Sequence, residues 1–351
     1  MKTIVSFFKS SIRRRLMAWA LALLGAALVL NTVAGSIYTR RQILQSNAEL
    51  QLEVASLTAR RIHALMIRKI ERLQDTGVAM TLHPQGANEQ KLLGLLLLKN
   101  DRSFTEMAIL SGLGQELLKF AEQRVYLAAD LQDQSGSAAY QGAIGGKFYI
   151  SPVTTTEYAE PYVTMAVPLQ SAPRKTIGVL VAKANLKFLW DVIGATQFGI
   201  GGYSYLIDER AKLIAHRDPS LVLKGLKLQD LPKLRPFVRN RSEDAAPGEI
   251  GRGINGANVL SAYAAVPDLG WAVVVEEPVE VALADLEKLQ RYAIWLLVVG
   301  LFVGGVIVRL LPPPDSLSKA MQRFIQLGDS PMPLWVVWLV MEGCSGNGLH
   351  L

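Results

Sequence analysis

Cysteine is almost absent from this sequence of 351 residues, since Cys344 is the only one. One thiol cannot form an intramolecular disulfide, so a domain exposed outside the cytoplasm has to be held together by its core alone. Histidine is also scarce, and the four histidines do not show the spacing of a metal site. We therefore expect no structural disulfide, no bound metal and no other cofactor.

The sequence also lacks common catalytic signatures. It contains no G-x-S-x-G, no P-loop and no H-E-x-x-H motif. Gly251, Gly253 and Gly256 match G-x-G-x-x-G, but the strand-like NVLSAYAAV follows, whereas a dinucleotide site needs the N-terminus of a helix. These absences predict that the chain carries no catalytic domain, and they make an extracytoplasmic enzyme the least supported function.

Acidic residues are missing before the first of two long apolar stretches, residues 16–33 and 292–308. Each stretch, with its small apolar neighbours, approaches the ~20 helical residues that cross a ~30 Å hydrocarbon core. The basic residues ahead of the first stretch are Lys2, Lys9, Arg13, Arg14 and Arg15. Under the positive-inside rule they keep segment 1–15 in the cytoplasm and predict a first membrane helix over 16–37. The region between the stretches is then extracytoplasmic.

A cleaved signal peptide is the alternative for the first stretch, because a basic head, an apolar run and the small residues at 34–36 fit that pattern too. The second stretch would still anchor the protein, so the middle lies outside under either interpretation. The formal charge of +7 could indicate nucleic-acid binding, but the basic residues concentrate at the membrane flanks. We interpret the charge as a topology signal and expect no nucleic-acid partner.

The first strong pattern outside the membrane is helical. Residues 38–76 carry apolar side chains at spacings of three, four and seven, which predicts a long amphipathic stalk helix that ends at Gly77. A second helix is expected over residues 87–98, through the string LLGLLLL. We interpret the apolar stripe of the stalk as a packing face against a sheet or a partner subunit.

From residue 104 the pattern changes to strands. FTEMAIL, SGLG and QELLKF predict a hairpin, and KFYISPV, YVTMAVPL and IGVLVAKANL predict three more strands. The pattern recurs in GYSYLIDERAKLIAHRDPS, NVLSAYAAV and GWAVVVEEP. We predict an α+β fold with two antiparallel-sheet modules, over 77–195 and 196–277. A charged, Gly-rich loop is expected at 239–258, and His216 is expected to bond to the turn at Asp218.

These strings resemble a known family. A long membrane-emergent helix followed by two PAS-like sheets, with FYISPV, AVPL, IGVLVAKANL, YLIDERAKLIAHRDPS and GWAVVVEEPVEVA in that order, is similar to the double-Cache sensor region of bacterial membrane receptors. The resemblance covers roughly residues 40–290. It implies a two-pass protein of the bacterial inner membrane whose first, membrane-distal module binds a small molecule. It also implies an output inside the cell through a histidine kinase, a chemoreceptor or a cyclic-nucleotide enzyme.

The resemblance also suggests ligand-binding residues. Amino-acid-binding relatives carry an Arg-x-Trp-Tyr element and a later Asp, whereas this chain has Gly146 in the Arg slot, Phe148 and Tyr149 in the aromatic slots, and Lys183 near the Asp slot. A lysine in a partly desolvated pocket favours an anion, such as a small carboxylate. The predicted site residues are Tyr149, Ser151, Tyr158, Thr164 and Lys183. The alternative is that Lys183 lies on the solvent face of its strand, together with Val181.

The chain leaves the second module at Pro278, which suits the first turn of a helix. Nothing from there to residue 311 breaks the helical pattern, so one helix over 278–311 is expected to include the second membrane span. Gly300 and Gly304 form G-x-x-x-G within it. This motif fits a homodimer interface, a contact with the first span, or ordinary glycines of a membrane helix.

Residues 312–330 resemble the opening of a HAMP linker, with a proline, an amphipathic helix and Gly328-Asp329. The second HAMP helix is missing, and the apolar run in the tail at 331–351 is too short to span a bilayer. We expect a truncation or frame change after Asp329, so that this chain is the input part of a histidine-kinase-type receptor without its output domain. The alternative is a solute-binding or decoy module that captures ligand, or pairs with a full-length receptor, without output of its own.

Overall fold

The computed structural model describes residues 2–310 with short gaps. The gaps are residues 83–85, 122–123, 157–159, 173–174, 230, 232–233, 235–236 and 238–244. The chain divides into a unit of sheets and helices, Thr39–Asp285, and a helical unit made of Met1–Tyr38 and Leu286–Leu351. The HAMP-like segment and the tail that the sequence suggests, residues 312–351, lie outside the described residues.

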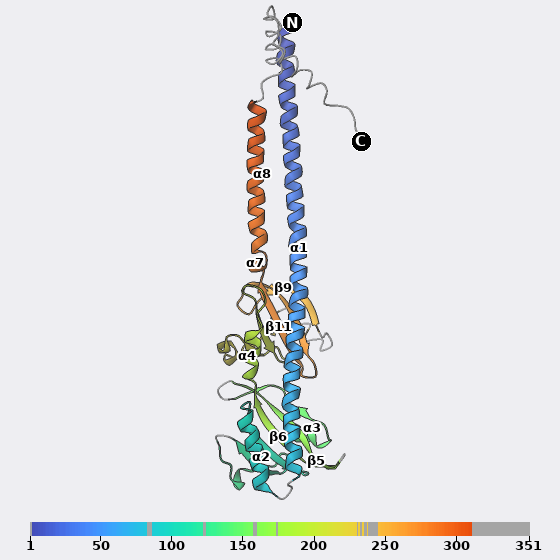
Figure 1. Cartoon of the computed structure of the whole chain (residues 1–351), viewed down its shortest axis with the longest axis vertical. Coiled ribbons are helices and arrows are strands. Elements are labelled where there is room, and N and C mark those ends of the chain that lie inside the picture. The colour runs from blue at the N-terminus through green and yellow to red at the C-terminus, as the bar shows by residue number, and fades with distance from the viewer. Residues whose placement is uncertain are drawn as a thin grey trace, which may run out of the picture. The chain divides into compact units, whose positions relative to one another are not determined.

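One helix, α1 (Lys2–Thr81), includes the predicted stalk (Figure 1). It continues past Gly77, so the prediction that this glycine ends the helix was wrong. A Cβ atom at Gly77 would lie 3.0 Å from Leu169 Cδ2 and close to Leu180 and Val167. The glycine therefore lets the first sheet approach the helix closely instead of ending it.

The first module is a six-stranded sheet with its helices. Its elements are α2 (Ala87–Asn100), β1 (Phe104–Ser111), β2 (Glu116–Ala121), η1 (Ala128–Asp130), α3 (Ala138–Ile144), β3 (Tyr149–Ile150), β4 (Thr154–Thr155), β5 (Pro161–Ala172), β6 (Lys175–Asn185) and α4 (Phe188–Ala195). The strand order is β2-β1-β6-β5-β3, and β4 pairs with β5. The predicted hairpin and the strands in YVTMAVPL and IGVLVAKANL are confirmed, whereas KFYISPV is extended in a sheet only at β3.

The second module has five strands in the order β8-β7-β11-β10-β9. Its elements are β7 (Tyr203–Ile207), β8 (Leu213–His216), α5 (Pro219–Leu223), β9 (Ala245–Arg252), β10 (Asn258–Val266) and β11 (Trp271–Pro278). The prediction of a loop over residues 239–258 was wrong, because β9 lies within it. The sequence of β9, AAPGEIGR, is loop-like, but β9 is an edge strand that pairs with β10 through backbone hydrogen bonds and needs no apolar pattern of its own.

The two sheets repeat one topology, which confirms the predicted duplication: β1, β2, β5 and β6 correspond to β7, β8, β10 and β11. In the first sheet Glu106 of β1 and Thr164 of β5 both pair with Lys183 of β6. In the second sheet Tyr203 of β7 pairs with Glu276 of β11. The first hairpin of each sheet has a register shift at the same point, after Ile109 and after Leu206. Three residues before it lie Glu106 and Tyr203, so these two are equivalent, and their partners Lys183 and Glu276 are equivalent as well.

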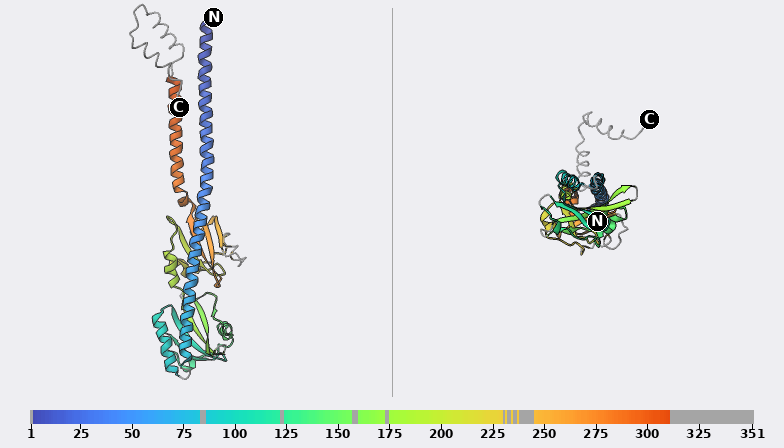
Figure 2. Two further views of the ribbon diagram at one scale, coloured as in Figure 1. Left: turned by 45° about the vertical axis from the view of Figure 1, so that its right-hand side comes forward. Right: turned by 90° about the horizontal axis from the view of Figure 1, so that it is seen from below.

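The main core lies between α1 and one face of each sheet, and both sheets lie along this helix (Figures 1 and 2). The buried core side chains of α1 are Ala55, Ala59, Ile62, Met66, Ile70, Leu73 and Met80. The other face of the first sheet packs under α3, and the other face of the second sheet packs under α5 and the residues that follow it. Each module thus has a covered outer face in which a site could form.

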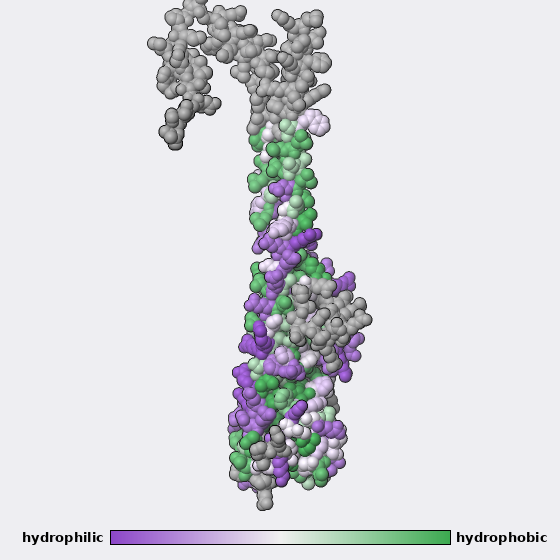
Figure 3. Space-filling view, turned by 90° about the vertical axis from the view of Figure 1, so that its right-hand side faces the viewer, coloured by the Kyte–Doolittle hydropathy of each residue, from purple (hydrophilic) through white to green (hydrophobic). Residues whose placement is uncertain are grey.

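The helical unit contains helices that are long and apolar enough to cross a membrane, the first part of α1 and α8 (Ala284–Leu310). Their described surface is largely hydrophobic (Figure 3). The two helices are in contact, because Gln290 Nε2 donates to Ser36 Oγ and a Cβ at Gly25 would lie 3.0 Å from Leu301 Cδ2. Among the described residues, no neighbour lies within 4 Å of a Cβ built at Gly300, so this glycine has no close contact with the described part of the first span.

The segment that follows the second sheet does not form the single helix over residues 278–311 that the sequence suggests. A short helix, α7 (Val279–Ala282), follows β11 and ends at Leu283, whose φ of −103° and ψ of 0° separate it from α8. Leu283 and Val279 are 6% and 9% exposed. Burial of both side chains against the module accounts for this interruption, which no proline or glycine in the sequence marks.

Candidate ligand-binding site

A cavity of about 300 Å³ lies on the outer face of the first sheet, between β1, β2, β5 and β6 and the residues around α3. Four of the five predicted site residues line it: Tyr149, Ser151, Thr164 and Lys183. Tyr158 lies outside the described residues. Val181 lines the same cavity, as strand alternation with Lys183 predicts. Lys183 therefore faces a cavity, and its side chain is 44% exposed.

The floor of the cavity carries four charged side chains of alternating sign. Lys183 Nζ lies 3.1 Å from Glu106 Oε1, which lies 3.6 Å from Lys119 Nζ. Lys119 Nζ in turn lies 3.5 Å from Glu116 Oε1. We refer to these four residues, on β6, β1 and β2, as the charge ladder. Its two positive and two negative groups give it no net formal charge.

Glu106 is the carboxylate of the ladder that contacts both lysines. Tyr126 Oη donates to Glu106 Oε2 at 2.6 Å. Burial would raise the pKa of Glu106, but the hydrogen bond from Tyr126 and the charges of Lys183 and Lys119 outweigh it and hold that pKa below its ordinary value. Glu106 is therefore ionised at neutral pH. Burial and the contact with Glu106 raise the pKa of Tyr126 to about 12.

The two ends of the ladder differ in accessibility. The side chain of Glu116 is 3% exposed, and it accepts hydrogen bonds from Gln132 N–H at 3.0 Å and Gln134 Nε2 at 3.3 Å. Lys183, at the other end, is the most exposed member. A ligand that enters the cavity can therefore reach an ammonium more easily than a carboxylate.

Hydroxyl groups flank the accessible lysine. Thr164 pairs with Lys183 across β5 and β6, and the Thr164 N–H donates to Ser151 Oγ at 2.9 Å. Tyr149 on β3 lies against Gly142 of α3, where a Cβ would come within 3.0 Å of the tyrosine ring. The Ser151 hydroxyl itself donates to the Pro152 carbonyl at 2.9 Å, so Ser151 fixes this edge of the cavity. Lys183, with the hydroxyls of Thr164 and Tyr149 in the same cavity, can bind a carboxylate through charge-assisted hydrogen bonds.

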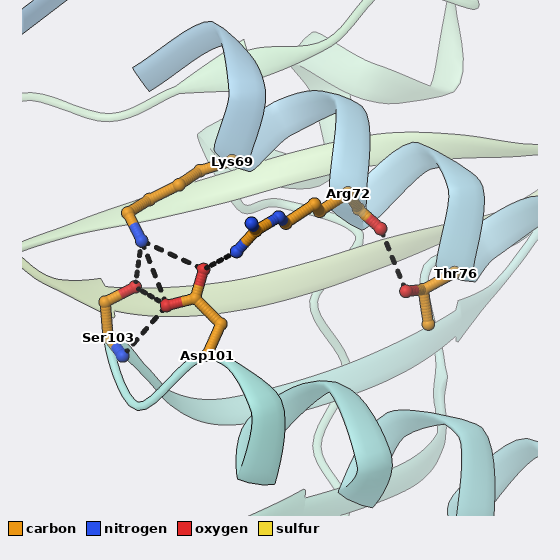
Figure 4. A network of polar contacts seen from close by, with 5 residues as sticks. All are labelled: Lys69, Arg72, Thr76, Asp101 and Ser103. Carbon is orange, nitrogen blue, oxygen red and sulfur yellow. Dashed lines mark hydrogen bonds and ion pairs between the residues drawn. The ribbon is translucent and has the colours of Figure 1, made fainter. Parts of the chain in front are cut away.

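A second polar network attaches the start of β1 to α1 (Figure 4). Lys69 Nζ lies 2.9 Å from Asp101 Oδ2 and 2.6 Å from Ser103 Oγ, and Arg72 Nη1 lies 3.1 Å from Asp101 Oδ2. Burial would raise the pKa of Asp101, but the contacts with Ser103 and Lys69 lower it overall. The network holds the strand that carries Glu106 against the helix.

The equivalent strand positions of the second module hold a buried carboxylate and a tyrosine. Glu276 is 0% exposed and accepts hydrogen bonds from Tyr203 Oη at 2.6 Å and Tyr205 Oη at 2.5 Å. Burial and the Glu276 carboxylate raise the pKa of both tyrosines. A protein carboxylate thus stands at the position where the first module has Lys183 and a cavity.

His216 and the glycine motif have structural roles in this module. His216 Nδ1 accepts the Asp218 N–H at 2.8 Å, which confirms the predicted bond to the turn. The G-x-G-x-x-G stretch forms the turn from β9 to β10, and the Ile254 N–H points to Glu276 Oε2 at 3.4 Å. In the part of the chain that the structure describes, no group of three His, Cys, Asp or Glu residues could hold a metal ion.

Comparisons with known proteins agree with this geometry. The model of a Cache domain family, dCache_1, matches residues 38–286. The methyl-accepting chemotaxis protein McpA of Pseudomonas putida is 25% identical, over 81% of this chain and 44% of McpA. PscA of Pseudomonas syringae pv. tomato is 24% identical, over 86% of this chain and 48% of PscA. The chain spans about half the length of these curated relatives.

Solved structures share the fold. The ligand-binding domain of the Campylobacter jejuni chemoreceptor Tlp3 in complex with L-norvaline has a TM-score of 0.53 and 14% identity, over 69% of this chain and 94% of that one. The ligand-binding domain of Pseudomonas fluorescens CtaA in complex with L-isoleucine has a TM-score of 0.51 and 16% identity, over 70% and 98%. The α+β prediction is confirmed. The family model matches more than half of this chain. The chain therefore belongs to the Cache domain family, as the double-Cache sensor of a transmembrane receptor.

Proposed function

We propose that this chain is the extracytoplasmic sensor of a two-pass receptor, and that it binds a small carboxylate-containing molecule in the cavity of its first module. The observation that carries the proposal is the position of Lys183, at the accessible end of the charge ladder and beside Thr164. A cavity of about 300 Å³ suits a ligand of few atoms.

The relatives favour a chemoreceptor over the histidine-kinase type that the sequence suggested. The curated proteins that match are methyl-accepting chemotaxis proteins, and they are about twice as long as the matched part. We propose that the signal from this sensor reaches a chemotaxis-type output. We also propose a homodimer, which the exposed Leu50 and Leu57, seven residues apart on α1, would support.

The ladder favours a zwitterion among carboxylates. A ligand with one carboxylate and one ammonium leaves the neutral balance of the ladder unchanged, whereas a dianion would bring two negative charges towards Glu106 and Glu116. The Tlp3 and CtaA domains were solved with L-norvaline and L-isoleucine. Small amino acids are therefore the first ligands to test, with Lys183 as the partner of the carboxylate.

A thermal-shift panel tests this proposal. The unit Thr39–Asp285 is compact and includes the whole cavity. Ligand at 100 times its Kd stabilises the folded state by about 2.7 kcal/mol. For a domain of this size that corresponds to about 5–10 °C in Tm. We expect shifts of this size from some small amino acids or monocarboxylates, and little from dicarboxylates. If none of these compounds shifts the Tm at millimolar concentration, the proposed ligand class is wrong.

Cysteine labelling tests the proposed topology. In a Cys344→Ser background, Leu113→Cys places a thiol in the turn between β1 and β2, where Leu113 is 81% exposed. We expect a membrane-impermeant maleimide to label it in intact spheroplasts, and to label Lys2→Cys only after the membrane is permeabilised. Labelling of the Lys2→Cys thiol alone in intact spheroplasts would reverse the proposed orientation.

A further inference from the structure

The segment that follows β2 is attached to the charge ladder by one side chain. We refer to residues 124–130, which include η1, as the strap. Tyr126 is half-buried, whereas its immediate neighbours in the strap are exposed, and its Oη donates to Glu106 Oε2 at 2.6 Å. Lys119 Nζ and Arg124 Cζ lie over the Tyr126 ring, at 5.0 Å and 4.9 Å from its centre. Tyr126 is therefore held at both its ring and its hydroxyl, although it does not line the cavity.

The bond from Tyr126 leaves one carboxylate oxygen of Glu106 for the other members of the ladder. Oε2 accepts the Tyr126 hydroxyl, whereas Oε1 lies 3.1 Å from Lys183 Nζ and 3.6 Å from Lys119 Nζ. Both lysines thus share Oε1. The terminal torsion of a glutamate side chain is soft, so without the hydroxyl of Tyr126 the carboxylate is free to turn and to give one oxygen to each lysine. The hydroxyl therefore determines that Oε1 is the oxygen beside Lys183.

A ligand carboxylate at Lys183 changes the surroundings of Oε1, and this step rests on the proposed function. When the Lys183 ammonium turns to the ligand, Oε1 keeps only its longer contact with Lys119. Glu106 is also the more accessible carboxylate of the ladder, with a side chain 20% exposed against 3% for Glu116. An ammonium group on the ligand can replace the contact that Oε1 has lost, whereas a plain monocarboxylate leaves it unreplaced. The orientation of Oε1 therefore affects these two kinds of ligand differently.

We propose that Tyr126 is a positioning residue that makes the cavity prefer a carboxylate bearing an ammonium group over one without it, by holding Glu106 with Oε1 beside Lys183. Tyr126 acts from outside the cavity, through a carboxylate that the ligand reaches. Burial and the contact with Glu106 raise the pKa of Tyr126 to about 12, so the phenol remains a donor at every physiological pH. Among the described residues, the charged or titratable groups that face Glu106 are Lys183 on β6, Lys119 on β2 and Tyr126 on the strap.

Matched pairs of compounds test this preference in the full chain, carried in lipid nanodiscs. L-alanine and propionate differ only in the ammonium group, as do glycine and acetate. We expect the parent protein to bind the amino acid of a pair about ten- to a hundredfold more tightly, which is the contribution of a hydrogen bond to a charged group. Tyr126→Phe keeps the ring and removes the hydroxyl, and it should reduce this preference about tenfold. Isothermal titration calorimetry with the four compounds measures the preference.

The pH dependence of the Tm tests the positioning role without ligand. Glu106 has a lowered pKa, so the stability that its charge contributes is present above about pH 4.5 and is lost as the pH falls through the lowered pKa. Tyr126→Phe should lower the Tm at pH 7, and its difference from the parent protein should shrink below about pH 4.5. Tyr140→Phe is the matched control, because Tyr140 Oη donates at 2.6 Å to an uncharged acceptor, the Gly112 carbonyl, and Tyr140 does not line the cavity. Its effect on the Tm should not depend on pH, and its ligand preference should equal that of the parent protein.

The possible results separate the role of Tyr126 from the proposed function. A tenfold loss of preference in Tyr126→Phe, together with a pH-dependent loss of Tm that Tyr140→Phe lacks, supports the positioning role. An unchanged preference in Tyr126→Phe, or a loss of Tm that is the same at every pH, would overturn that role and leave the cavity as the ligand site. If none of the four compounds binds to the parent protein, the positioning role and the ligand class on which it rests are both wrong.

Discussion

Replacing Glu276 with alanine is expected to lower the free energy of unfolding by about 2–4 kcal/mol, because a buried group left without its hydrogen-bond partner costs about 1–3 kcal/mol and the lost side chain leaves a cavity. The Glu276 carboxylate is the acceptor for two buried phenols and is itself 0% exposed. Alanine would leave the hydroxyl of the fully buried Tyr205 without this partner and would open a cavity beside it. Chemical denaturation of the unit Thr39–Asp285, followed by circular dichroism, measures the change.

Two variants calibrate this result. Glu276→Gln keeps one acceptor oxygen and should cost less than alanine. Glu280→Ala removes an exposed carboxylate four residues further on and should change stability by less than about 0.5 kcal/mol. Equal effects of the alanine substitutions at 276 and 280 would mean that the tyrosine and glutamate cluster does not hold the second module together.

Lys183→Met is expected to weaken ligand binding about ten- to a hundredfold, while the Tm of the unliganded protein changes little. The substitution removes the proposed partner of the ligand carboxylate and leaves Glu106 without its closest cation, so that its negative charge repels the ligand. A hydrogen bond to a charged group contributes about 1.5–3 kcal/mol, and the partial exposure of Lys183 keeps the expected loss within this range. Stability should change little because the lysine side chain is 44% exposed. Isothermal titration calorimetry measures the loss.

Lys187→Met is the matched control. Lys187 follows the same strand, has a side chain that is 48% exposed, and pairs with Glu160, but it does not line the cavity. Its replacement should leave the Kd within about twofold of the parent value. If both substitutions weaken binding to the same degree, the effect of Lys183 is one of general surface charge, and the ligand does not contact it.

Local patterns in the sequence were sufficient to predict the fold class and most of the strands. FTEMAIL, YVTMAVPL and GWAVVVEEP are short runs rich in β-branched, aromatic and other apolar residues, and such runs predict strands without knowledge of the partner strand. The end of α1 was missed because Gly77 has a packing role there, and a glycine in a helix does not by itself end it. The edge strand β9 was missed because its pairing depends on β10, which follows it, and not on its own composition.

The cavity was only partly predictable. Tyr149, Ser151, Thr164 and Lys183 were proposed from the family resemblance, and all four line it. The carboxylate of Glu106 was not proposed, although it alternates with Ala108 and Leu110 in its strand. Only the register between β1 and β6 places it opposite Lys183, and the two residues are 77 positions apart in the sequence.

The most direct test is a crystal structure of the unit Thr39–Asp285 with the compound that gives the largest thermal shift. We predict that the ligand occupies the cavity of the first module, with its carboxylate about 2.7–3.2 Å from Lys183 Nζ. A ligand bound in the second module or on the outer surface, with Lys183 still paired only to Glu106, would contradict the proposed site.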